Sequence, residues 1–135
     1  MTTETTKDNV KKKRILIVDD EPDVNMVLRK VFEKSGFNTD SYDDPISVLE
    51  NFNAGSYDLV LLDIKMPEMD GFHLYKELKK IDNNVKVCFL TAGEIYREHL
   101  GKEDVCALDK DLFIRKPLEN EDLIQRINTI ISQDT

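Results

Sequence analysis

Leu59-Val60-Leu61-Leu62-Asp63 is the stretch of sequence that decides the fold, because it is a short apolar run that stops at an acidic residue. A continuous apolar run of this length, without alternating polar residues, is typical of a strand buried on both faces of a parallel sheet. Ile15-Leu16-Ile17-Val18 has the same character and stops at Asp19-Asp20. We therefore expect both runs to be central strands of one parallel sheet.

Three more strands are expected on either side of these runs, at about 38–41, 85–90 and 112–114, the first being polar enough for a sheet edge. Helices are expected where apolar residues recur three and four positions apart. One runs from Pro22 to a stop at Gly36, with a stripe of Val24, Val27, Leu28, Val31 and Phe32. Another runs from Pro45 to Gly55, a third carries Phe72, Tyr75 and Leu78, and the last carries Leu123, Ile124, Ile127, Ile130 and Ile131. Segment 94–111 fits a helix only loosely. Strand and helix thus alternate five times, which predicts an α/β fold with a parallel sheet covered by helices on both faces.

The 135 residues suit one domain, expected over 14–132, with a disordered leader at 1–13 and a short tail at 133–135. The formal net charge of −8 argues against nucleic-acid binding by this domain alone. No signal peptide or membrane-length apolar run is present, so a cytoplasmic protein without membrane contact is expected. Cys88 and Cys106 lack metal-binding spacing, and Cys88 reads as a core residue. His73 and His99 are expected at the surface.

Polar residues stand at the predicted strand ends: Asp19, Asp20, Asp63, Thr91 and Lys116. Ligands of open α/β sheets bind beyond the carboxyl ends of the strands, so these residues are expected to converge there. Crowded carboxylates favour a hard cation such as Mg²⁺, which takes one or two of them directly. A lysine and a hydroxyl opposite the cation suit the oxygens of a transferring phosphoryl group, and a carboxylate is a plausible nucleophile for it.

Each of these residues, taken alone, also has an ordinary structural interpretation. An acidic pair before a helix is often a cap. Asp63 alone would more often be structural, Thr91 a turn residue, Lys116 a solvated side chain and Phe113 a core residue. Only the joint pattern favours a functional site.

The order and spacing of Asp19-Asp20, Asp63, Met66-Pro67, Asp70-Gly71, Thr91-Ala92 and Lys116-Pro117 resembles the response-regulator receiver domain over about 14–132. The resemblance implies a flavodoxin-like, doubly wound five-stranded sheet in the order 2-1-3-4-5. It implies that Asp63 is the phosphoacceptor. The implied Mg²⁺ ligands are Asp19, Asp20, Asp63 and the backbone carbonyl of Lys65. The implied phosphoryl contacts are Thr91, the backbone of Ala92, and Lys116. The implied switch residues are Thr91 and Phe113, and a cis bond is implied before Pro117.

The resemblance further implies a signalling switch rather than an enzyme. Asp63 would take a phosphoryl group from a histidine kinase or phosphotransfer protein. Phosphorylation would then change how the chain binds a downstream protein partner through the face formed by segment 94–111, the fifth strand and the last helix. The same face is a candidate surface for a homodimer. The sequence departs from the family pattern at Asp109-Lys110-Asp111, where a glycine-containing turn is common, and at Phe113, where tyrosine is common.

Two other functions remain as alternatives. One is a degenerate receiver that acts as a constitutive interaction module, against which the full acidic set argues. The other is a phosphatase of the haloacid-dehalogenase type, which wants a second aspartate two residues after the first, where this chain has Lys65. No output domain is expected after the last helix, so the chain either contacts partners directly or is a fragment of a longer protein.

Overall fold

The computed structural model describes residues 13–64, 66, 68–92, 113–116 and 119–132. The strands in this part are β1 (Arg14–Val18), β2 (Asn38–Tyr42), β3 (Leu59–Asp63), β4 (Val87–Ala92) and β5 (Phe113–Lys116). The helices are α2 (Pro22–Lys34), α3 (Pro45–Asn51), α4 (Gly71–Ile81) and α7 (Asn120–Ser132). None of these helices combines the length and the apolar character needed to cross a membrane. Residues 1–12 of the leader predicted at 1–13, segment 94–111 and the tail at 133–135 lie outside the described residues.

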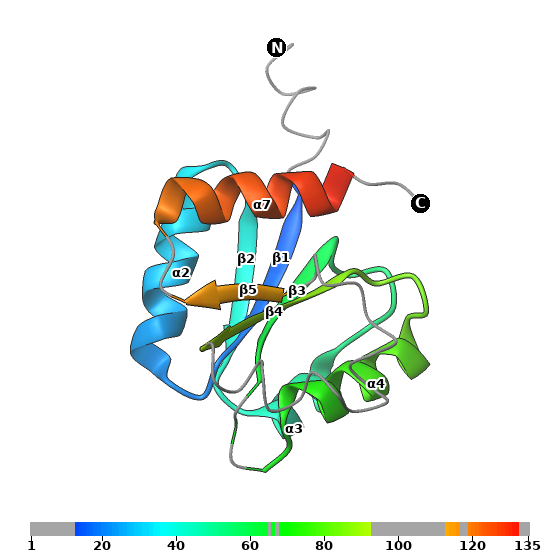
Figure 1. Cartoon of the computed structure of the whole chain (residues 1–135). Helices are drawn as coiled ribbons and strands as arrows, with labels where there is room; N and C mark the ends of the chain where they lie inside the picture. Colours follow the sequence, from blue (N-terminus) through cyan, green and yellow to red (C-terminus); the bar gives the residue numbers. More distant parts are fainter. Residues whose placement is uncertain (1–12, 65, 67, 93–112, 117–118, 133–135) are drawn as a thin grey trace, which may run out of the picture.

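The five strands form one sheet in the order β2-β1-β3-β4-β5, and every neighbouring pair is parallel (Figure 1). The predicted fold class and strand order are therefore confirmed. The polar strand β2 pairs only with β1 and lies at an edge, as its composition indicates. Because all the strands run in the same direction, their carboxyl ends lie along one side of the sheet.

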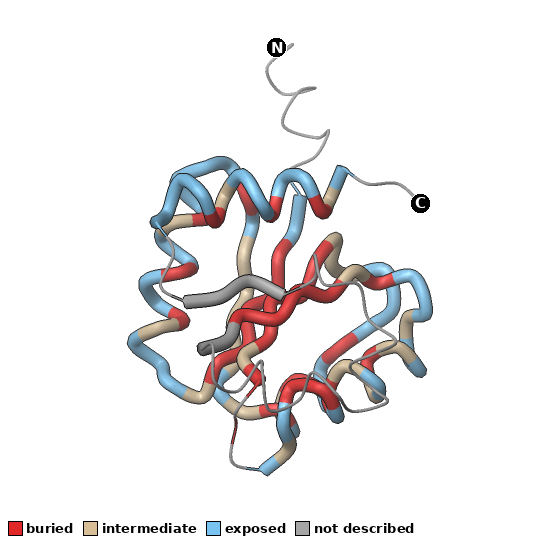
Figure 2. The backbone as a smooth tube through the Cα atoms, viewed as in Figure 1, coloured by how far each residue is buried: buried red, intermediate tan, exposed pale blue. Residues whose placement is uncertain are grey.

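Helices cover both faces of the sheet, so its central strands are buried from both sides (Figure 2). Successive side chains of a strand point to opposite faces. In β1, Leu16 and Val18 join the core cluster shared with α3 and α4, whereas Ile15 and Ile17 join the cluster shared with α2 and α7. This double burial explains why the runs in β1 and β3 are apolar at every position.

The buried face of α2 differs from the predicted stripe. Val27, which was expected in the stripe, is 57% exposed, and the buried side chains of the helix are Asn25, Leu28 and Phe32. The helix is thus turned so that a polar residue of its first turn faces the sheet. The helix ends close to Gly36, whose φ of 99° requires the left-handed conformation that glycine adopts without strain.

β4 begins and ends later than predicted, and β5 ends later than predicted. β4 begins at Val87 rather than Val85, because the Val85 carbonyl accepts a hydrogen bond from Lys79 Nζ (2.8 Å) and the Val85 amide closes a turn onto Asp82. Val85 is nevertheless buried, which accounts for its apolar character. β5 continues to Lys116 instead of stopping at Ile114. The ends of both strands therefore include residues that were predicted to follow them.

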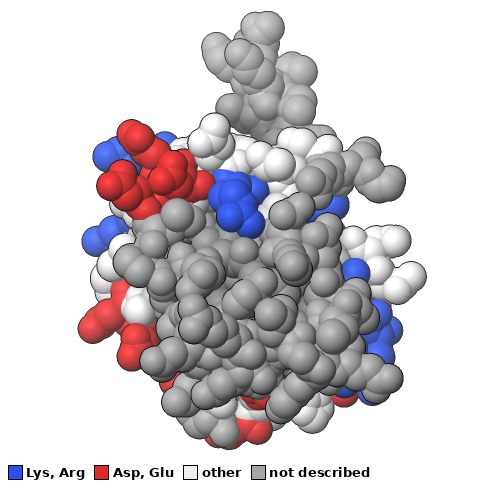
Figure 3. Space-filling model, viewed as in Figure 1, with Lys and Arg blue, Asp and Glu red and all other residues white. Residues whose placement is uncertain are grey.

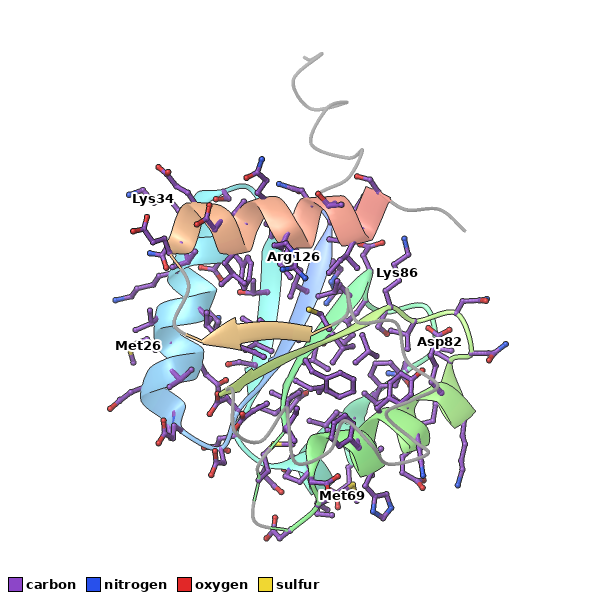
Figure 4. The ribbon with its side chains drawn as sticks, in the orientation of Figure 1. Met26, Lys34, Met69, Asp82, Lys86 and Arg126 are labelled. Carbon is purple, nitrogen blue, oxygen red and sulfur yellow. The ribbon has the colours of Figure 1, made fainter. Side chains whose placement is uncertain are left out.

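The last helix, α7, is stabilised electrostatically at both ends. Acidic side chains gather around its amino-terminal end (Figure 3), where Glu121 and Asp122 occupy the first turn and complement the helix dipole. At the other end Lys86 extends toward the helix (Figure 4) and its Nζ donates hydrogen bonds to the carbonyls of Ile130 (3.1 Å) and Ile131 (2.8 Å). Lys86 precedes β4, so this contact ties the end of α7 to the start of a central strand.

Candidate metal and phosphoryl site

Asp19 follows β1 directly and is held in place by its main chain and its side chain. The residue is only 3% exposed. Its amide donates to the Tyr42 carbonyl (3.3 Å), and its Oδ1 accepts a hydrogen bond from the Glu21 amide (3.0 Å). This turn leads into α2 at Pro22, a residue type that suits a helix start because it lacks an amide proton. Asp19 is therefore a rigid carboxylate at the carboxyl end of the inner strand β1, and Asp20 beside it is half-buried.

Asp63 is the last residue of β3, and the loop that follows it packs against its main chain. Val18 pairs with Leu62, so Asp19 and Asp63 lie at the same level of neighbouring strands. Gly71 donates from its amide to the Ile64 carbonyl (2.7 Å). A Cβ atom added to Gly71 would clash with the Asp63 carbonyl oxygen and lie 3.0 Å from the Ile64 Cα. Only glycine lets the start of α4 approach Asp63 this closely.

The three aspartates form the acidic cluster predicted from the sequence. One carboxylate oxygen from each of Asp19, Asp20 and Asp63 lies within 4.8 Å of the other two. Two oxygens bound to the same Mg²⁺ are at most about 4.2 Å apart, because each bond is about 2.1 Å long. Separations of up to 4.8 Å are close to this limit, so the cluster fits Mg²⁺, which typically takes one or two carboxylates directly and keeps water in the rest of its shell. The all-oxygen donor set also favours this ion over zinc.

The other predicted site residues can be placed only by their position in the sheet. Asp63 pairs with Leu90, and Ala92 pairs with Lys116, so Thr91, Ala92 and Lys116 end their strands on the side where the aspartates gather. Their side chains, and that of Phe113 at the start of β5, lie outside the described part of the chain. The backbone carbonyl of Lys65 and the bond before Pro117 also lie outside it, so these assignments stay predictions.

Neighbouring acidic residues have ordinary structural roles. Asp70 caps α4 by accepting a hydrogen bond from the His73 amide (2.9 Å). Asp44 caps α3, and hydrogen bonds from the Ser47 hydroxyl and the Ile46 amide lower the pKa of its carboxyl group. His73 is exposed, as predicted. The hydrogen bonds of Asp44 and Asp70 therefore account for these two aspartates as helix caps.

Sequence reasoning missed two residues that shape the site, Asn25 and Gly71. The Asn25 side chain, 5% exposed, donates to the carbonyls of Asp19 (2.8 Å) and Tyr42 (3.2 Å). The available signal was its spacing, because Asn25 lies three and seven residues before the buried Leu28 and Phe32. Gly71 was recognised only as part of a motif. No local pattern reveals that its missing side chain makes room for the Asp63 main chain.

Comparison with known proteins identifies the family. The family description that matches residues 15–128 is the response regulator receiver domain. Among curated relatives, the transcriptional regulatory protein RprY of Bacteroides fragilis is 32% identical over 123 residues, which cover 89% of this chain and 50% of RprY. Sporulation initiation phosphotransferase F of Bacillus subtilis is 40% identical over 91 residues, which cover 67% of this chain and 73% of that protein. The chain spans about half the length of RprY and of most of the curated relatives it matches.

Solved structures agree with this assignment. The response regulator TrrA of Thermotoga maritima, in complex with Mg²⁺-BeF, is 31% identical with a TM-score of 0.74, over 87% of this chain and 98% of TrrA. The non-phosphorylated receiver domain of HemR from Leptospira biflexa is 26% identical with a TM-score of 0.77, over 92% of this chain and 98% of HemR. Fold, strand order and sequence agree, and the chain belongs to the response-regulator receiver domain family.

Proposed function

We propose that Asp63 accepts the phosphoryl group through which this receiver domain acts as a phosphorylation-dependent signalling switch. The observation that carries the proposal is the cluster of Asp19, Asp20 and Asp63 at the carboxyl ends of β1 and β3. Asp63 is the member that ends a strand at the centre of the sheet, and it lies between the strands that carry Asp19 and Thr91. Residues at the ends of both neighbouring strands, β1 and β4, would therefore lie beside a phosphoryl group on Asp63.

The transfer requires little covalent chemistry from the protein. A carboxylate oxygen of Asp63 attacks the phosphorus atom of a phosphohistidine, a P–O bond forms, the P–N bond breaks, and the imidazole leaves with the electron pair and takes up a proton. Bound Mg²⁺ supplies positive charge for the phosphoryl oxygens and for the crowded carboxylates. Asp19 and Asp20 would hold the ion. Thr91, the Ala92 amide and Lys116 would donate to the phosphoryl oxygens from the ends of β4 and β5.

The phosphodonor we propose is a histidine kinase or a phosphotransfer protein. Support comes from TrrA, whose structure has also been solved in complex with the histidine kinase ThkA, at 31% identity to this chain and a TM-score of 0.74. CheY of Borrelia burgdorferi, 29% identical with a TM-score of 0.76, has been solved in a complex with CheX, BeF3 and Mg²⁺. These complexes support the proposal of one protein partner upstream of the switch and another downstream of it. We propose that segment 94–111, β5 and α7 contribute the surface that binds the downstream partner or a second copy of the chain.

The proposal is tested by the intact mass of the protein after incubation with acetyl phosphate. We expect the mass to increase by one phosphoryl group when Mg²⁺ is present and to stay unchanged in EDTA. Asp63→Asn should abolish the gain, whereas Asp70→Asn, the same substitution at a helix cap, should retain it. Equal labelling of the wild type and Asp63→Asn would show that Asp63 is not the acceptor.

The alternative of a degenerate receiver makes the opposite prediction for Mg²⁺. Such a module would neither bind the ion at the cluster nor gain a phosphoryl group, and would still bind its partner. Calorimetric titration of the wild type and of Asp20→Asn with Mg²⁺ separates the two functions. Membership of the receiver family favours a signalling domain over the phosphatase alternative.

A further inference from the structure

We propose that Asn25 is a positioning residue for the cation site: it fixes the main chain of Asp19, and the Mg²⁺ affinity of the cluster depends on it. The inference deepens the proposed function and rests on it, since it takes Asp19 to be part of the cation site. Asn25 itself is not a ligand. Its side chain acts through Asp19.

The side-chain amide of Asn25 connects the ends of β1 and β2. Its Nδ2 donates to the Asp19 carbonyl, which follows β1, and to the Tyr42 carbonyl, which ends β2. The Tyr42 carbonyl also accepts from the Asp19 amide (3.3 Å). The amide and carbonyl of Asp19 are thus both held, one by the edge strand and the other by the first turn of α2. Little rotation of the Asp19 main chain remains possible.

The side chain of Asp19 is fixed by the same turn. Its Oδ1 accepts a hydrogen bond from the main-chain amide of Glu21. The Glu21 carbonyl in turn accepts one from the main-chain amide of Asn25 (3.2 Å). The bond from the main chain of residue 25 remains in any variant other than proline, so the contribution specific to the Asn25 side chain is the direct contact of Nδ2 with the Asp19 carbonyl. Groups that orient a metal ligand in this way commonly change metal affinity by about 10- to 100-fold when they are removed.

The hydrogen bonds of the buried Asn25 side chain indicate that its role is to donate from Nδ2. Among the described residues, its Oδ1 is the buried side-chain oxygen or nitrogen that has no hydrogen-bond partner. A buried polar atom without a partner is unfavourable, so burying Asn25 Oδ1 lowers the stability of the folded protein. Reversing the amide would place Oδ1 against two carbonyl oxygens, so the orientation with Nδ2 toward Asp19 and Tyr42 is the favourable one.

The next two residues of the helix, Met26 and Val27, do not share this buried position. Met26 is 55% exposed and extends away from the sheet (Figure 4), and Val27 is 57% exposed. A substitution of Met26 therefore changes the same turn of α2 without touching Asp19. Met26→Ala is the matched control for a local effect on the helix.

The test is calorimetric titration of the full chain with MgCl₂, for the wild type, Asn25→Ala, Asn25→Leu and Met26→Ala. Asn25→Leu fills the space with a good helix former, so it keeps the helix packed if Asn25→Ala folds poorly. A further control is Ile127→Val or Ile127→Ala, chosen to match the urea midpoint of the Asn25 variant, because Ile127 is a buried residue of α7, a different helix from the one that carries Asn25. Circular dichroism confirms that each variant is folded.

We expect the Kd for Mg²⁺ to rise about 10-fold in both Asn25 variants and to stay unchanged in Met26→Ala and the Ile127 control. Wild-type affinity in a folded Asn25 variant would overturn the positioning role and leave the proposed function intact. An equal loss of affinity in the Ile127 control would also overturn it, because lost stability alone would then explain the effect. A wild-type protein that binds no Mg²⁺, or binds it equally well as Asp20→Asn, would overturn the proposed function and the positioning role together.

Discussion

Asp20→Asn should make the protein more stable when no divalent cation is present. The oxygens of Asp19, Asp20 and Asp63 lie within 4.8 Å of one another, so Asp20 takes part in two repulsive pairs. At 4.8 Å, the upper limit of these separations, a pair costs about 0.9 kcal/mol in water and about 3.5 kcal/mol at an effective dielectric constant of 20. Asp20 is half-buried, so values toward the lower end apply. We expect the substitution to raise the free energy of unfolding by about 2 kcal/mol in EDTA.

Magnesium should remove this advantage. A ligand at 100 times its Kd stabilises the folded state by about 2.7 kcal/mol, so saturating Mg²⁺ should bring the wild type level with the variant or above it. The assay is urea unfolding followed by circular dichroism, in EDTA and in excess MgCl₂. With a slope of about 2 kcal/mol per molar urea, the expected shift of the midpoint in EDTA is about 1 M.

Glu50→Gln is the control for the change in net charge. Glu50 is exposed on α3, and Glu50→Gln removes one negative charge, as Asp20→Asn does. We expect its urea midpoint to stay close to that of the wild type with and without Mg²⁺. The reasoning about the cluster is refuted if Asp20→Asn is no more stable than the wild type in EDTA, or if Mg²⁺ stabilises both equally.

Three further predictions follow from individual contacts. Gly71→Ala should lower the free energy of unfolding by about 1–3 kcal/mol, because the added Cβ would clash with the Asp63 carbonyl, and it should slow phosphorylation; a fully stable variant would contradict the close approach. Lys86→Met should cost about 1–3 kcal/mol in urea unfolding, since two carbonyls in the last turn of α7 lose their donor, and hydrogen exchange there should increase. Burial raises the pKa of the Cys88 thiol to about 12, so at pH 8 the folded protein keeps it protonated. In a Cys106→Ser background the Cys88 thiol should not react with a disulfide reagent until urea is added, and rapid labelling without urea would refute its burial.

Much of the fold follows from local sequence. The runs in β1 and β3 are apolar at every position because both faces of these strands are covered, which made them recognisable as central strands. The faces of α3, α4 and α7 follow from the spacing of their apolar residues. The acidic cluster could be predicted because parallel strands bring their carboxyl ends to one side of the sheet.

What the sequence could not show depends on contacts between distant segments. Val27 is apolar yet exposed, while Asn25 is polar yet buried, because carbonyl groups at the ends of two strands satisfy the Asn25 amide. Hydropathy alone assigns both residues to the wrong side of α2. Similarly, Val85 has the apolar character of a strand residue, but its carbonyl accepts a hydrogen bond from the Lys79 side chain, and β4 begins only at Val87.

The central claim, that Asp63 carries the phosphoryl group, is tested most directly by mapping the modified residue. Borohydride reduces an acyl phosphate on aspartate to homoserine, which is stable during digestion and mass spectrometry. Trypsin places Asp63 in the peptide 35–65 and both Asp19 and Asp20 in the peptide 15–29, so the two possibilities separate by mass. After acetyl phosphate and Mg²⁺ we predict homoserine at position 63 in peptide 35–65. Homoserine in peptide 15–29, or none in either peptide of a protein that has gained a phosphoryl mass, would contradict the assignment.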